Sequence, residues 1–260
     1  MNKNKSFRKY ANDNKLKATN YEINYFNNTN GIRLNKYLSD AGICSRRQAD
    51  KLIEDGEVLI NGVVANVGDR VCEGMVVTYK DMVVKENLKK VIYAYNKPIG
   101  YVCTSKEADK DSIFNYTDFP VNVNYVGRLD KDSSGLLLLT NDGELSNSIQ
   151  KSRNNHEKEY RVRVNKDVTD DFISNMSKPV PILDTKTKSC YVKKTGTRSF
   201  TIVLTQGLNR QIRRMCEYFG YRVVNLKRVR VLNIKLGDLR PGEYRELSKE
   251  EEKKLRSMIG

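Results

Sequence analysis

Apolar side chains recur between residues 34 and 41 at the i, i+3, i+4, i+7 spacing of one helix face, and Gly42 suits the end of that helix. A second helix is expected over residues 45–56, where Ser45 and Gln48 have the spacing of a capping box. Its apolar positions again share one face, which leaves the polar positions on the outside.

Two runs of β-branched residues within 57–71 flank Asn61-Gly62, a pair typical of a type I′ hairpin turn. Two short helices and a small sheet predict a compact module over residues 31–80. Residues 1–30 are rich in Asn and Lys and show no apolar period, so we predict a disordered basic extension. Residues 81–90 are polar and charged and are predicted to be a linker.

A second domain is predicted over residues 91–256, where longer apolar runs alternate with turn signals. Strands outnumber helices and show no βαβ rhythm, which indicates an α+β fold with a mixed, mostly antiparallel sheet and flanking helices. The strands are expected at 91–95, 126–130, 136–140, 159–164 and 200–204, and the helices at 144–150, 209–219 and from Ser248 onward.

Composition excludes several classes of protein. The most obvious apolar run, residues 136–139, is far too short to span a bilayer, and the N-terminus lacks the apolar segment of a secretory signal. Five cysteines without a C-x-x-C pair favour a reducing cytoplasm over a disulfide scaffold or a zinc site. His156 is the single histidine, so a mechanism that needs two histidines is not available.

The net charge of +15 predicts a polyanionic partner, most often a nucleic acid. A general bias toward Lys and Asn would raise the charge equally without any ligand. The positions of the arginines must therefore decide between the two.

Residues 127–135 form the densest unusual stretch. Arg128 and Lys131 flank Asp130, an arrangement that keeps this carboxylate ionised and suits a nucleophile or an electrostatic stabiliser. On this segment alone, a polar turn between two strands explains the same residues more simply.

Two further segments could carry chemistry. Tyr160 enters an alternating strand, where a tyrosine is usually a core residue. Residues 209–216 bring three arginines to the start of a helix, which suits phosphate binding, and one of them could turn inward to pair with a carboxylate. A solvated basic helix face is the simpler alternative.

Together these segments resemble the RsuA-type pseudouridine synthases of rRNA. Residues 127–143 resemble the family's aspartate signature, residues 158–160 its tyrosine motif and residues 211–215 its arginine motif, in the family's order. Residues 32–80 resemble the small RNA-binding domain named after ribosomal protein four of the small subunit. The segments 155–160 and 207–220 look most like the F branch, which modifies large-subunit rRNA. Many relatives have Gly-Arg-x-His where this chain has Gly207-Leu-Asn-Arg210.

The resemblance implies a uridine that is flipped into a pocket and isomerised, with no cofactor and no metal. It implies three catalytic residues: Asp130 as nucleophile, Arg213 as the partner of Asp130, and Tyr160 packed against the base. It implies a cytoplasmic monomer whose partner is structured rRNA. The expected RNA contacts are Arg128, Leu129, Lys131, Arg210, Gln211 and Ile212, together with Arg46, Arg47 and Lys51 of the small module.

Two other classes remain open at this stage. A non-catalytic RNA-binding protein would share the N-terminal module but would leave the motifs after residue 125 unexplained. An N-glycoside hydrolase could use Asp130 and Asp132 as acid and nucleophile, although Lys131 and Ser133 do not supply the apolar setting that an acid needs.

Overall fold

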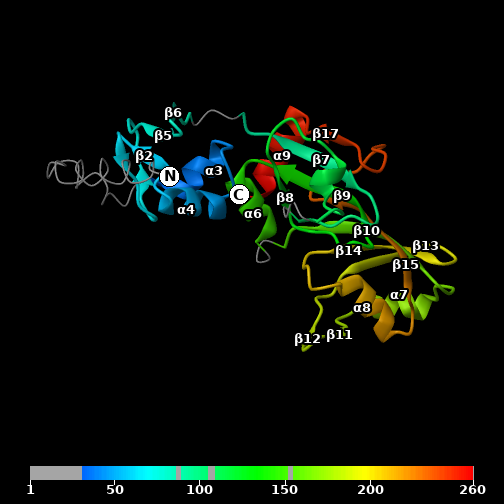
Figure 1. Cartoon of the computed structure of the whole chain (residues 1–260). Helices are drawn as coiled ribbons and strands as arrows, with labels where there is room; N and C mark the ends of the chain where they lie inside the picture. Colours follow the sequence, from blue (N-terminus) through cyan, green and yellow to red (C-terminus); the bar gives the residue numbers. More distant parts are fainter. Residues whose placement is uncertain (1–30, 86–88, 105–108, 152–154, 260) are drawn as a thin grey trace. The chain divides into compact units, whose positions relative to one another are not determined.

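The structure is a computed structural model that describes residues 31–85, 89–104, 109–151 and 155–259. The chain divides into two compact units, with the boundary between residues 89 and 90; the described residues of the first are drawn in blue to cyan and those of the second in green to red in Figure 1. The predicted disordered extension, residues 1–30, lies outside the described residues.

The first unit contains the two helices and the hairpin that the sequence predicts. Helix α3 (Leu34–Asp40) and helix α4 (Arg46–Glu54) pack on each other, and Ser45 and Gln48 form both hydrogen bonds of a capping box. Strands β2 (Val58–Ile60) and β3 (Val63–Val64) pair through a turn in which Asn61 and Gly62 have positive φ. The remaining strands are β1 (Ile32–Arg33), β4 (Arg70–Val71), β5 (Val77–Tyr79) and β6 (Met82–Val83).

The predicted linker, residues 81–90, begins too early. Met82 and Val83 form strand β6, which pairs with β5. Val84 is buried in the core of the first unit, and its carbonyl accepts a hydrogen bond from the hydroxyl of Tyr37. The polar composition of residues 81–90 did not predict these contacts, because β6 is an edge strand whose side chains are exposed.

The second unit is built on a nine-stranded sheet with the main order β13-β14-β10-β15-β9-β7-β17. Strand β8 pairs with β9 and strand β16 with β15, and the one parallel pair in this described sheet is β9 with β15. The α+β class and the mostly antiparallel sheet are therefore confirmed. The strands are β7 (Ile92–Lys97), β8 (Asn124–Val126), β9 (Ser134–Thr140), β10 (Lys158–Val164), β13 (Tyr191–Gly196), β14 (Ser199–Leu204), β15 (Val223–Val231), β16 (Ile234–Lys235) and β17 (Tyr244–Glu246), with β11 (Pro181–Ile182) and β12 (Thr185–Lys186) as a separate hairpin.

Helices cover both sides of this sheet, at different ends. Helices α6 (Gly143–Gln150) and α9 (Lys249–Ile259) contribute to the core over β7 and β9, and α7 (Asp170–Met176) and α8 (Gln211–Tyr218) to the core under β10 and β14. Figure 1 shows α7 and α8 on one side of β13, β14 and β15. The short helix α5 (Ile113–Tyr116) belongs to a third core, which includes Leu129 and packs against Tyr160.

Two of the element boundaries that differ from the predictions lie next to the candidate residues. The strand expected at 126–130 is β8, which ends at Val126, because Gly127 has a φ of 71° and turns the chain. The helix expected from residue 209 begins at Gln211, because Arg210 adopts a left-handed conformation. Both changes lengthen the loops that carry the candidate residues.

Candidate active site

Asp130 lies in the loop between β8 and β9, and 39% of its side chain is exposed. Leu129 anchors this loop in the core, and the Cys103 thiol donates to the carbonyl of Leu129. The loop therefore has a fixed backbone on one side of Asp130, while the carboxylate itself remains accessible.

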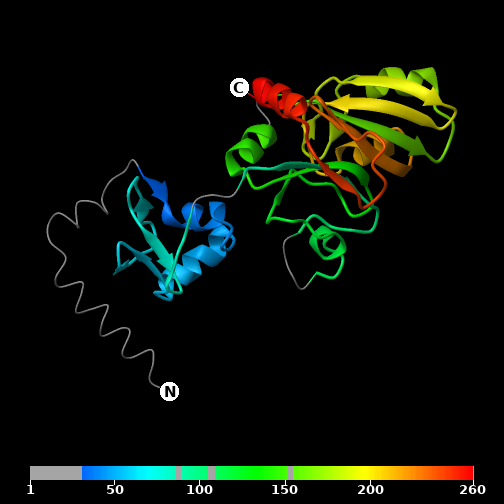
Figure 2. The same ribbon diagram turned by 90° about the horizontal axis from the view of Figure 1, so that it is seen from above.

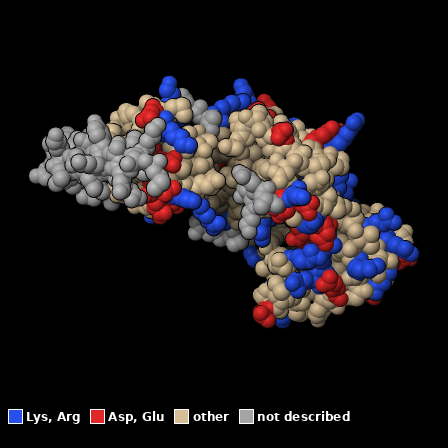
Figure 3. Space-filling view, in the orientation of Figure 1, with Lys and Arg blue, Asp and Glu red and all other residues tan. Residues whose placement is uncertain are grey.

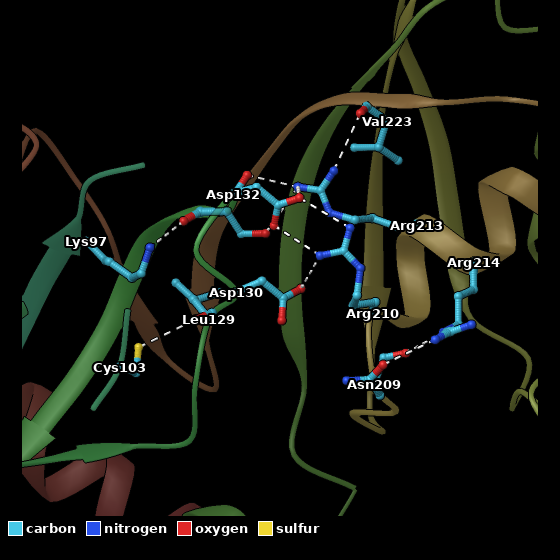
Figure 4. Close-up of polar contacts among 11 residues, drawn as sticks. Lys97, Cys103, Leu129, Asp130, Asp132, Asn209, Arg210, Arg213, Arg214 and Val223 are labelled. Atoms are coloured by element: carbon cyan, nitrogen blue, oxygen red, sulfur yellow. Dashed lines mark hydrogen bonds and ion pairs between the residues drawn. The ribbon is translucent and has the colours of Figure 1, made fainter. Parts of the chain in front are cut away.

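Two arginines at the start of α8 reach across to this loop (Figure 4). The guanidinium of Arg210 donates to both carboxylate oxygens of Asp132 at 3.3 Å, and its Nη1 lies 3.9 Å from the carboxylate of Asp130. Arg213, with 9% of its side chain exposed, donates to the main-chain carbonyl of Asp132 at 2.9 Å and lies 3.2 Å from the Asp132 carboxylate. These contacts join the loop to α8.

The expected ion pair between Arg213 and Asp130 is wrong. The guanidinium of Arg213 is held between the carbonyl of Val223 and the residues Asp132 and Ser133, so it meets the loop two residues beyond Asp130. Arg210, which was expected to contact RNA, is the arginine beside Asp130. Arg213 thus positions the loop, and the cation nearest to the candidate nucleophile comes from the residue before the helix.

Lys97 also holds this loop in place. The sequence did not indicate this role. Its side chain is buried, and its ammonium donates to the carbonyls of Ser133 and Pro98. Burial lowers the pKa of Lys97, and the nearby carboxylates Asp130 and Asp132 oppose that shift. The available signal was a lysine that ends an apolar strand just before a proline.

Tyr160 is half-buried and packs against two cores, the one that α7 and α8 cover and the one that includes α5 and Leu129. It lies opposite Arg228 in β15, and Arg228 lies opposite Gly135 in β9, so one row across three strands links Tyr160 to the end of the Asp130 loop. Gly135 allows this approach, because a Cβ there would lie 2.2 Å from the carbonyl oxygen of Arg228. This row therefore connects Tyr160 with the strand that follows the Asp130 loop.

The expected RNA contacts separate into buried and exposed residues. Leu129, Gln211 and Ile212 are buried, so their side chains are not part of the surface, and their expected contact with RNA stays a prediction. Leu129 and Ile212 belong to the cores, and the Gln211 amide oxygen accepts from the main-chain N–H of Leu208. Apolar and amide side chains at a helix start follow the packing of that helix, which the motif pattern did not reveal.

The remaining expected contacts are on the surface. Arg46, Arg47 and Lys51 are exposed on α4, as predicted. Arg128 is exposed beside Asp130 and has no hydrogen bond or ion pair with the part of the chain that the structure describes. Lys131 is also exposed, but its ammonium lies 2.5 Å from the carboxylate of Asp111. Figure 3 shows Lys and Arg over the surface of both units, interspersed with carboxylates.

Within the described ranges, no group of three or more His, Cys, Asp or Glu side chains could hold a metal ion. No helix in these ranges is long and apolar enough to cross a bilayer. The site is therefore built from carboxylates, arginines, a tyrosine and a buried lysine.

Comparison with known proteins gives consistent matches along the chain. Residues 91–218 match the family described as RNA pseudouridylate synthase, and residues 32–77 match the S4 domain. The chain is 50% identical to the dual-specificity RNA pseudouridine synthase RluF of Salmonella typhi, over 84% of this chain and 76% of that protein. It is 32% identical to the ribosomal large subunit pseudouridine synthase B of Bacillus subtilis, over 87% of this chain and 96% of that protein. A crystal structure of a pseudouridylate synthase matches with a TM-score of 0.64 and 27% identity, over 86% of this chain and 99% of that one.

Proposed function

Because the chain belongs to the family of RNA pseudouridine synthases, we propose that it isomerises a specific uridine of large-subunit rRNA, with Asp130 as nucleophile. The observation that carries the assignment of Asp130 is its half-exposed carboxylate, on a loop fixed by α8, by Leu129 and by Lys97. A fixed loop with one accessible carboxylate is the arrangement that a positioned nucleophile needs.

The reaction is an isomerisation, so atoms and charge must balance within the nucleotide. The bond between the sugar and N1 of uracil breaks, the base rotates, and a new bond joins the sugar to C5. The proton that C5 loses is balanced by the proton that N1 gains. Asp130 acts on the breaking bond, Arg210 lies beside the carboxylate, and Tyr160 forms an apolar wall for the base.

Arg213 acts by positioning rather than by contact with the substrate. It holds Asp132 and the backbone around it, and so fixes the direction in which Asp130 projects. Arg128 is exposed next to Asp130, where it can bind the phosphate of the flipped nucleotide or fill the space that the base leaves.

We propose that the small unit also binds the RNA substrate. Arg46, Arg47 and Lys51 share the exposed side of α4, and the matching S4 domain covers the same residues. Such contacts position a structured RNA without reading its sequence. We further propose that the enzyme acts as a cytoplasmic monomer.

The test is to map pseudouridine in rRNA from cells that lack this protein, before and after the wild-type chain is restored. We expect one uridine or a few neighbouring uridines of the large-subunit rRNA to lose and regain the modification. An unchanged rRNA map would contradict the proposed substrate. Release of free uracil from rRNA by the purified protein would instead indicate the N-glycoside hydrolase.

A further inference from the structure

A groove of about 670 Å³ lies on the sheet of the second unit, and nothing in the proposed reaction uses it. Strands β10 and β15 form it together with β16 and the turn that follows at residues 236–238. The basic side chains that line it are Arg161, Lys227, Arg230 and Lys235, against the two carboxylates Glu159 and Asp238.

This groove opens on the opposite side of the sheet from Tyr160. Along β10, Tyr160 and Val162 pack against the core that α7 and α8 cover, while Arg161 alternates to the exposed side. Arg161 lies directly opposite Lys227 in β15, and residues opposite each other in an antiparallel pair share a face. In Figure 2 the strands β13 and β14 (yellow) are seen from their open side, with helices behind them.

An irregularity in β15 concentrates the positive charge. The register shifts between Glu159 and Tyr160, which face Arg230 and Arg228 and leave Val229 as an extra residue. Strict alternation would place Lys227 and Arg230 on opposite faces, whereas both line the groove.

Three of the four cations are available to a ligand. Arg230 is occupied, because it donates to Glu159 at 2.9 Å and to Glu157 at 3.0 Å. The side chains of Arg161, Lys227 and Lys235 have no hydrogen bond or ion pair with any residue that the structure describes. Unpaired cations beside a concave surface are a site for an anion with several charges.

The exposed strand face extends this site along one row. Lys193 in β13 lies opposite Thr201 in β14, and Thr201 lies opposite Arg161. Three strand intervals separate Lys193 from Lys227, a distance of ~14 Å at the usual strand spacing. Tyr191, 59% exposed and two residues before Lys193, supplies an aromatic ring on the same face. A row of cations with an aromatic ring beside it suits a nucleic acid backbone with an accessible base.

We propose that this groove and the row beside it bind the phosphate backbone of a second segment of the folded RNA substrate. The proposal rests on the proposed function, because it assumes an RNA substrate. It predicts a contact that only a large RNA can make, since the groove and Asp130 are on opposite sides of one sheet.

The test compares two RNAs and two double variants. The RNAs are deproteinised large-subunit rRNA from cells lacking the protein and a short stem–loop fragment around its modified uridine. The groove variant carries Arg161→Gln and Lys227→Gln. The control carries Lys253→Gln and Lys254→Gln, which remove the same charge from exposed positions on α9.

We expect the groove variant to lower the slope of log affinity against log salt by ~1.4 on the long RNA, which corresponds to two phosphate contacts at ~0.7 each. On the short fragment, its affinity and single-turnover rate should equal those of the control. Equal slopes for the groove and control variants on the long RNA would overturn the proposal. If the wild-type chain forms no pseudouridine in rRNA, the proposed function fails instead.

A second measurement uses the unsubstituted chain, so it does not depend on how a variant folds. An amine-reactive reagent should label Lys227 and Lys235 in the free protein and label them several-fold less when the long RNA is bound. Lys253 and Lys254 provide the internal reference. Unchanged labelling of Lys227 and Lys235 in the bound protein would also overturn the proposal.

Discussion

Two helices, α4 and α8, begin with clusters of arginines, yet the structure uses them in opposite ways. Arg46 and Arg47 at the start of α4 are exposed, and the helix is capped by Ser45 and Gln48 within the same segment. Arg210 and Arg213 at the start of α8 bind a loop about 80 residues earlier in the chain, and Arg213 is buried there. The same residue type thus provides an exposed basic surface in one unit and a buried contact between a helix and a loop in the other.

The difference follows from how far apart in the sequence the contacting residues lie. The side-chain cap of α4 and the turn after β2 each involve residues within three or four positions of one another. The candidate active site depends on the pairing of β9 with β15 and on the ion pairs between α8 and Asp132. Substitutions should therefore have local effects in the first unit and effects on both stability and catalysis in the second.

The largest effect is expected from Gly135→Ala. A Cβ at residue 135 would lie 2.2 Å from the Arg228 carbonyl oxygen, and the φ of 102° adds backbone strain. We expect a loss of ~3 kcal/mol or more in unfolding free energy, together with loss of activity. Gly62→Ala is the matched control, because its φ is also positive but no atom lies within 4 Å of the added Cβ. Gly62→Ala should lower the unfolding free energy by ~1 kcal/mol in denaturant unfolding. Equal losses at the two positions would contradict the distinction between local contacts in the first unit and distant contacts in the second.

Arg213→Lys tests whether Arg213 holds the Asp130 loop in place. A lysine keeps the charge but cannot bond Asp132 and Val223 with one planar group. We expect the single-turnover rate to fall by ~100-fold and the unfolding free energy by ~2 kcal/mol, while RNA affinity changes little.

Arg214→Lys is the control for this variant, since Arg214 is bonded to Asn209 and not to the loop. Its rate should stay within a few-fold of wild type. If Arg213→Lys changed only the salt dependence of RNA binding, Arg213 would be an RNA contact and would not hold the loop in place.

The sequence predicts those parts of the structure that depend on neighbouring residues. Helix α4, its cap and the Asn61-Gly62 turn were correct because their causes lie within a few positions. The partner of Arg213 was wrong, because Asp130 and Asp132 are two residues apart and only the fold decides which one meets α8. Lys97 was missed for the same reason, since its hydrogen-bond acceptor is the carbonyl of Ser133, 36 positions away.

Asp142 combines a local contact with a distant one. Its carboxylate caps α6 and also lies 3.2 Å from the guanidinium of Arg256 in α9. Burial acts to raise its pKa, but the N–H of Leu145 and the cations Arg256 and Lys90 hold the pKa below its usual value. Because the pKa of Asp142 is lower in the folded than in the unfolded protein, its ionised carboxylate stabilises the fold at pH values above the pKa of the unfolded protein. This stabilisation is lost as the pH falls below ~4.

Asp142→Asn keeps a good capping residue and removes the charge. We therefore expect it to cost ~1 kcal/mol at pH 7, because Arg256 and Lys90 are partly exposed, and less at pH 3. Thermal unfolding of both proteins across this pH range gives the difference. A difference that grows toward acid would show that the ion pair is not its source.

The smallest effect is expected from Arg47→Ala on the exposed side of α4. Removal of one phosphate contact should lower the slope of log affinity against log salt by ~0.7, with no change in the unfolding free energy or in the single-turnover rate. A slower chemical step at saturating RNA would show that the first unit contributes to catalysis and not to binding alone.

The most direct test is to measure single-turnover pseudouridine formation by Asp130→Asn and Asp132→Asn in preparations cleared of wild-type enzyme. Both substitutions remove one charge from the same loop, but only Asp130 is proposed to act on the glycosidic bond. We expect no product from Asp130→Asn at unchanged RNA affinity, and slowed but measurable formation by Asp132→Asn. Product from Asp130→Asn, or complete loss in Asp132→Asn alone, would contradict the assignment of Asp130 as the nucleophile.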